Sequence, residues 1–164
     1  YCVVTKTTNI KDVYRTLNYY IKPANQTDNI SGIIGTVLIC FMYLSLFRVV
    51  PVTSLIIMPA AGFSNLMILS KVIKRDLENT SILKYCGNYH IIAAFGISFL
   101  SAAILNYKLI ISLSLMFMLS GLIVSILDKR IKNVPSSVEG FIIEVSQIMF
   151  LIITYVIRLG DTPL

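Results

Sequence analysis

Long stretches that are poor in charge alternate along this chain with short basic segments. The stretches cover about residues 29–49, 50–70, 86–107, 108–127 and, more weakly, 136–158. A helix needs about 20 predominantly apolar residues to cross the hydrocarbon core of a bilayer. Backbone groups in lipid must pair within their own segment, and the short alternating strands of a barrel are not part of this pattern. The pattern therefore predicts an all-α polytopic membrane protein with about five transmembrane helices.

The fifth stretch reaches spanning length only when two acidic residues are included. From Val145 to Ile157 there are 13 uncharged residues, which is too few to span a bilayer alone. A helix that starts near Ser136 and takes in Glu139 and Glu144 is long enough. Whether this helix crosses completely is left open by the sequence.

The composition supports a membrane protein and excludes most other classes. Hydrophobic residues make up 56% of the 164 residues and charged residues 13%, and the mean hydropathy is +0.81. Soluble domains contain about 25% charged residues. A water-soluble fold of this size has too much surface to hide such an apolar excess in one core. The lipid bilayer is therefore the first expected partner, and a disordered chain is excluded.

The basic residues divide unevenly between the two sides of the predicted bundle. With the N-terminus inside and five crossings, eleven of the 14 fall inside, and only Arg48, Lys108 and Arg158 fall outside. This bias predicts an inside N-terminus. Residues 1–28 then form a polar basic tail on the inside, and residues 29–164 form the transmembrane domain. The clusters are short and do not interleave with aromatic residues, so no nucleic-acid partner is expected.

Two halves of the chain share one layout. Residues 31–76 and 88–132 each contain an apolar stretch, a single basic residue, a second apolar stretch and a closing basic cluster. The single basic residues, Arg48 and Lys108, are 60 positions apart. We expect two tight helical hairpins followed by a C-terminal helix. One explanation of the shared layout is a parallel repeat, as in some transporters. The other is that any two helical hairpins flanked by basic clusters on the inside of the membrane have this layout.

The predicted second helix contains a proline at its middle. Pro59 removes a backbone donor and should kink the helix, which frees a carbonyl group about one turn earlier. One interpretation is a hinge or an ion-coordinating break. The other is a kink that is simply packed against a neighbouring helix, and this second interpretation is favoured.

Four polar residues in or beside the spans are candidates for chemistry. Glu139 and Glu144 precede the densest apolar stretch and are expected to share roughly one helix face. A carboxylate inside a span is a candidate for a proton or cation pathway. The favoured alternative places both at the membrane interface, where the helix dipole stabilises negative charge. His90 and Arg48 are expected to be polar residues at the interface.

No cofactor or metal is expected from the residues present. His90 is the single histidine, and the three cysteines Cys2, Cys40 and Cys86 lie far apart. No catalytic residue is indicated, so an enzyme is the least favoured class.

Two functions fit this pattern. The favoured one is a non-catalytic multi-pass subunit that packs against other membrane subunits in a hetero-complex, for example an energy-transducing one. The alternative is a small ion or solute transporter or channel, built as a homo-oligomer, that uses Glu139, Glu144 and the Pro59 kink. A basic inner face suits the mitochondrial inner membrane and a bacterial plasma membrane.

Overall fold

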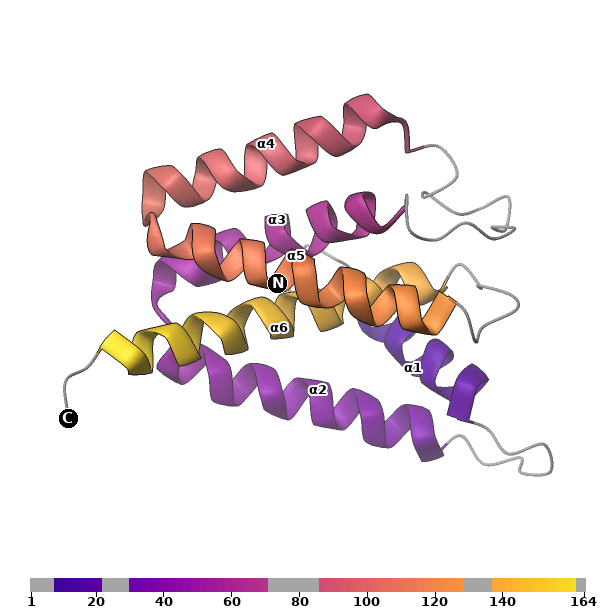
Figure 1. Cartoon of the computed structure of the whole chain (residues 1–164). Coiled ribbons are helices and arrows are strands. Elements are labelled where there is room, and N and C mark those ends of the chain that lie inside the picture. The colour runs from indigo at the N-terminus through magenta and orange to yellow at the C-terminus, as the bar shows by residue number, and fades with distance from the viewer. Residues whose placement is uncertain (1–7, 22–29, 71–85, 129–136, 162–164) are drawn as a thin grey trace.

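The computed structural model describes residues 8–21, 30–70, 86–128 and 137–161. Every regular element in these ranges is a helix (Figure 1). The helices are α1 (Thr8–Ile21), α2 (Ile30–Val49), α3 (Val52–Leu69), α4 (Asn88–Leu105), α5 (Lys108–Asp128) and α6 (Ser137–Asp161). The all-helical prediction is thus confirmed, with one helix more than expected.

Five of the six helices, α2 to α6, are long and apolar enough to cross a membrane. They occupy the five charge-poor stretches of the sequence. These helices suggest a membrane protein. The longest, α6, has 25 residues and includes Glu139 and Glu144.

The C-terminal helix α6 occupies the centre of the bundle. It packs against α1, α2, α3 and α5, whereas α4 packs on α3 and α5 at one edge (Figure 1). More than half of the spanning part of α6 is buried, compared with 11% of α4. A helix in this position has side chains on most of its faces inside protein, so its polar residues are the natural place to look for a site.

The connections between the long helices alternate between the two ends of the bundle. Val50 and Pro51 join α2 to α3, and Asn106 and Tyr107 join α4 to α5 at the same end (Figure 1). Although their connection is short, α2 and α3 make few contacts with each other, because α6 lies between them. The predicted tight hairpin is therefore a short connection here and not a closely packed pair.

At this end of the bundle, a hydrogen bond joins the end of α6 to the end of α2. Nη1 of Arg158 donates to the backbone oxygen of Val49 at 2.9 Å and ties the end of α6 to the end of α2. The basic segments 71–85 and 129–136, on which the orientation argument depends, lie outside the described residues.

Helix α1 was not expected within the polar tail. Its buried positions Asn9, Val13 and Thr16 recur at helical spacing, while Lys11 and Arg15 are exposed. This is the pattern of an amphipathic helix. Two of the three buried residues are polar, so a search for long apolar stretches does not find it.

Candidate functional site

The side chain of Glu144 lies inside the bundle, two turns into α6. It is 0% exposed, and the hydroxyl group of Tyr43 on α2 lies 2.6 Å from its Oε2 atom. Tyr43 itself is buried. The carboxyl group of Glu144 is therefore enclosed by helices and does not lie on the outer surface of the bundle.

Gln147 extends this contact by one turn of α6. The Tyr43 hydroxyl lies 2.9 Å from Oε1 of Gln147, and the Gln147 side chain is 0% exposed. Within the described residues, Nε2 of Gln147 is a buried donor without a hydrogen-bond partner. Buried polar groups are normally satisfied, so this amide marks an incomplete polar site.

The proton count in this group of three side chains permits two arrangements. The Tyr43 hydroxyl has one proton but lies beside two oxygen atoms, Glu144 Oε2 and Gln147 Oε1. In the first arrangement Glu144 is protonated and donates to the phenol oxygen, which donates to Gln147. In the second, the phenol donates to an ionised Glu144, and the Gln147 amide is turned so that its nitrogen donates to the phenol oxygen. Both use the two side-chain contacts of the Tyr43 hydroxyl, because amide orientation is set by the surrounding hydrogen bonds; the backbone oxygen of Glu144 lies farther from the hydroxyl, at 3.4 Å.

The close approach of α3 to this site depends on a glycine. A Cβ atom on Gly62 would lie 2.7 Å from Cγ and 2.8 Å from Nε2 of Gln147, and 3.0 Å from the backbone oxygen of Ile143. Any side chain at this position would displace Gln147 or move α3 away from α6. The lack of a side chain at Gly62 therefore leaves the space that Gln147 occupies beside Tyr43.

A second polar group joins α3, α5 and α6 on another side of α6. Nδ2 of Asn65 donates to Oγ of Ser146 at 2.6 Å, and Oγ of Ser120 donates to Oδ1 of Asn65 at 2.7 Å. Ser146 donates in turn to the backbone oxygen of Ile142. This group has a partner for each side chain and resembles the polar contacts that hold membrane helices together.

An apolar layer separates Glu144 from the end of the bundle that carries Arg158. Beyond Gln147, the next buried residues of α6 are all apolar, namely Ile148, Phe150 and Leu151. The layer is completed by the fully buried side chains of Ile57, Leu113 and Met116.

Glu139 does not share a face with Glu144. Five residues advance a helix by about 1.4 turns, which leaves the two side chains about 140° apart. The expectation of a common face is therefore wrong for these positions on the continuous helix α6. Glu139 is buried at 8% exposure, beside Gly140 in the first turn of α6.

Asp12 of α1 lies next to this first turn. Its carboxyl group packs on Gly140, within 2.6 Å of the place where a Cβ atom would be. Partial burial, and secondarily the charge of Glu139, raise the pKa of Asp12, while Arg15 and Lys11 act in the opposite direction. The contact of α1 with α6 therefore brings a partly buried carboxyl group close to Gly140 in the first turn of α6.

The structure does not bring the other candidates to Glu144. Pro59 is half-buried inside α3, which continues through it. His90 is exposed at the start of α4, where its Nδ1 accepts the backbone N–H of Gly87 at 3.2 Å. Arg48 is exposed in the last turn of α2. Within the described ranges, no group of three or more His, Cys, Asp or Glu side chains is placed to hold a metal ion.

Five residues of the two polar groups were missed from sequence: Tyr43, Gln147, Asn65, Ser120 and Ser146. Gln147 follows Glu144 by three positions, the spacing at which helical side chains become neighbours. Asn65 and Tyr43 each lie well inside an apolar stretch. The sequence signal that could have identified them is a polar residue far from both ends of a predicted span. Comparison with protein-family models, curated protein sequences and solved structures finds no match.

Proposed function

We propose that this chain is a multi-pass integral membrane protein that moves protons or small cations, with Glu144 as the exchanging group. The observation that carries the proposal is the complete burial of the Glu144 carboxyl group against the Tyr43 hydroxyl. An ionisable side chain inside a membrane bundle is costly and is typical of proton and ion pathways. Packing alone would be served as well by an apolar residue of similar size.

The contrast between the two polar groups supports this interpretation. The group around Asn65 is closed, and it needs no further component to satisfy its side chains. The group around Glu144 retains a buried donor on Gln147. We therefore assign a structural role to the first group and proton exchange to the second.

The exchange needs only small rearrangements of the side chains. When Glu144 is protonated, it donates to the phenol oxygen of Tyr43, and the phenol donates to Gln147. When the proton leaves Glu144, the phenol proton turns to the carboxylate, and the Gln147 amide turns to donate to the phenol oxygen. The carboxyl group loses one proton, and the hydrogen bonds of the three side chains are preserved. The site thus supports both charge states of Glu144.

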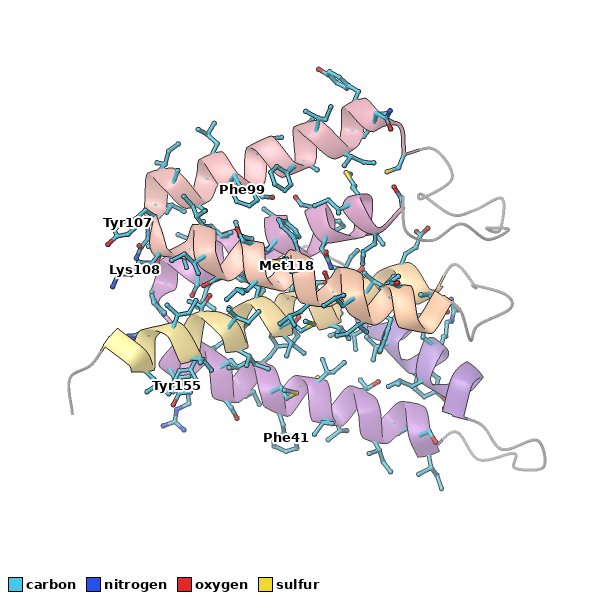
Figure 2. All side chains as sticks on the ribbon, viewed as in Figure 1. Phe41, Phe99, Tyr107, Lys108, Met118 and Tyr155 are labelled. Carbon is cyan, nitrogen blue, oxygen red and sulfur yellow. The ribbon has the colours of Figure 1, made fainter. Side chains whose placement is uncertain are left out.

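A second candidate function is a non-catalytic subunit that packs against other membrane subunits. The observation that favours it is the outer surface of α2, α4 and α5, which exposes many large apolar side chains, such as Phe41 on α2 and Met118 on α5 (Figure 2). Lipid covers such a surface in a single bundle, and neighbouring subunits cover it in a complex. In this case Glu144 would serve only to position α6.

The orientation and the membrane belong to the same proposal. We place the N-terminus inside, since the basic clusters of the sequence would then face the cytoplasm or the mitochondrial matrix. The described helix ends that flank segments 71–85 and 129–136, namely the end of α3, the start of α4, the end of α5 and the start of α6, lie at the end of the bundle opposite to Tyr107 and Lys108 (Figures 1 and 2). A bacterial plasma membrane or the mitochondrial inner membrane fits this arrangement.

Purification in mild detergent distinguishes the two functions. The chain is isolated with whatever it binds, and the isolated species is placed in liposomes loaded with a pH-sensitive dye. Proton or cation flux from the isolated chain or its homo-oligomer supports exchange at Glu144. A stable hetero-complex, with no flux from the chain by itself, supports the packing subunit.

A further inference from the structure

Two contacts fix the register of α1 against α6. Oγ1 of Thr16 donates to Oγ of Ser137 at 3.1 Å, and the Asp12 carboxyl group lies on Gly140. Asp12 lies four residues before Thr16 in α1, whereas Gly140 lies three residues after Ser137 in α6. The two helices therefore run antiparallel. One further turn of each helix places Asn9 at the level of residues 143–144.

Helix α1 also packs on the start of α2. The backbone N–H of Gly32 donates to Oδ1 of Asn18 at 2.8 Å, and the side chain of Leu17 fills the space beside Gly35. Helix α1 therefore contacts both helices that form the site, α2 with Tyr43 and α6 with Glu144.

Asn9 also has the properties of a site residue. It is 8% exposed, and its Nδ2 atom is the second buried donor without a hydrogen-bond partner in the described part of the chain. The other is Nε2 of Gln147. An unsatisfied buried donor destabilises the folded protein, so an apolar residue would pack better at this position unless the amide has a function.

We propose that Asn9 is a positioning residue of the Glu144 site and that its amide donates a hydrogen bond to the carboxylate when Glu144 loses its proton. This inference rests on the proposed function, because it assigns Asn9 to the ionised state of the exchange. A donor amide stabilises a carboxylate more than a carboxylic acid. Helix α1 then contributes the Asn9 amide, which favours release of the proton from Glu144.

The ionisable groups around this position are few. Helix α1 brings Asp12 to the α6 contact and exposes Lys11 and Arg15, α2 brings Tyr43, and α6 itself carries Glu139 in its first turn. Helix α3 has no ionisable side chain, and α5 has ionisable residues at its two ends only. Asp12 is the group whose titration must be separated from that of Glu144.

The test measures the protonation of Glu144 chemically, without using transport. Dicyclohexylcarbodiimide, an apolar reagent, reacts with protonated carboxyl groups, and mass spectrometry of the labelled peptide reports modification at Glu144. The labelling rate is measured against pH for the full chain in detergent and for Asn9→Leu, Asn9→Ala and Asn65→Leu. Asn65→Leu is the matched control, because it removes a buried asparagine from the closed polar group.

The inference predicts that Asn9→Leu and Asn9→Ala move the pH midpoint of labelling upward by at least about one unit, since hydrogen bonds to charged groups are worth about 1.5–3 kcal/mol. Asn65→Leu leaves the midpoint in place, and so does Asp12→Asn. An unchanged midpoint in either Asn9 variant, or an equal shift in Asn65→Leu, overturns the role of Asn9. Absence of flux from the wild-type chain would refute the proposed function and leaves this measurement intact.

Discussion

The hydroxyl group of Tyr43 and the carboxyl group of Glu144 meet at 2.6 Å, although 101 positions separate the two residues. This contact joins the first long helix to the last and lies where α6 enters between α2 and α3. The contact is both a structural link and the centre of the candidate site.

Removal of the Tyr43 hydroxyl should destabilise the bundle. Tyr43→Phe deletes the polar partner of Glu144 and Gln147 and should lower the free energy of unfolding by about 1–2 kcal/mol. Unfolding of the purified chain in detergent, titrated with a denaturing detergent, measures this change. Tyr89→Phe is the matched control, since Tyr89 is 81% exposed. Equal stabilities of the two variants would show that the Tyr43 contact contributes nothing.

Glycine positions give a sharper test of the packing between α3 and α6. Gly62→Ala should lower stability by about 1–3 kcal/mol, because overpacking forces a neighbour to move, and here Gln147 and the Ile143 backbone are in the way. Gly96→Ala on α4 is the control, as a Cβ atom there has no neighbour within 4 Å. That substitution should leave stability unchanged or raise it by up to about 1 kcal/mol. The same unfolding titration with a denaturing detergent compares both variants, and equal losses would contradict the close α3–α6 contact.

The sequence was sufficient to predict the long helices but not their arrangement. Hydropathy and helix length locate α2 to α6, because each must satisfy its backbone internally and each is apolar for about 20 residues. The identity of the central helix follows from side-chain contacts between distant segments, such as Asn65 with Ser146. Local patterns do not record such contacts. Adjacent position in the chain suggested that α2 and α3 pack as a pair, and the insertion of α6 prevents this.

The environment of Glu144 also could not be predicted from local sequence patterns. A carboxylate near the start of a span has two possible environments, the interface and the protein interior, and the nearby basic residues of the sequence favoured the interface. The decisive feature is Tyr43 on a helix that precedes α6 by about 100 residues. Helix α1, which the register places over the site, escaped prediction because Asn9 and Thr16 are polar although buried.

The topology is tested by labelling cysteines from one side of the membrane. In a background without native cysteines, Asn79→Cys and Tyr107→Cys should react with an impermeant maleimide from opposite faces. Tyr107 is exposed at the α4–α5 turn (Figure 2), and the positive-inside rule places residue 79 on the other side. Labelling of both positions from the same face would contradict the five crossings.

Asp12 gives the protein a pH dependence with a defined sign. Its pKa is raised in the folded state, first by burial, so the folded chain binds this proton more tightly than the unfolded chain. Stability should therefore fall as the pH rises from the ordinary pKa of an aspartate to the raised value. Asp12→Asn should be more stable than the wild type at neutral pH, and the difference should vanish in acid. Unfolding measured as a function of pH tests this, and a difference that grows in acid would contradict it.

The most direct test of the central claim is proton flux through liposomes that contain the wild-type chain, Glu144→Gln or Glu139→Gln. Glu144→Gln retains the size of the side chain and a hydrogen bond to Tyr43 but cannot exchange a proton. Glu139→Gln is the matched control on the same helix, because Glu139 points away from Glu144. The account predicts that Glu144→Gln folds, inserts and loses the flux, while Glu139→Gln retains most of it. Wild-type flux that persists in Glu144→Gln would contradict the account.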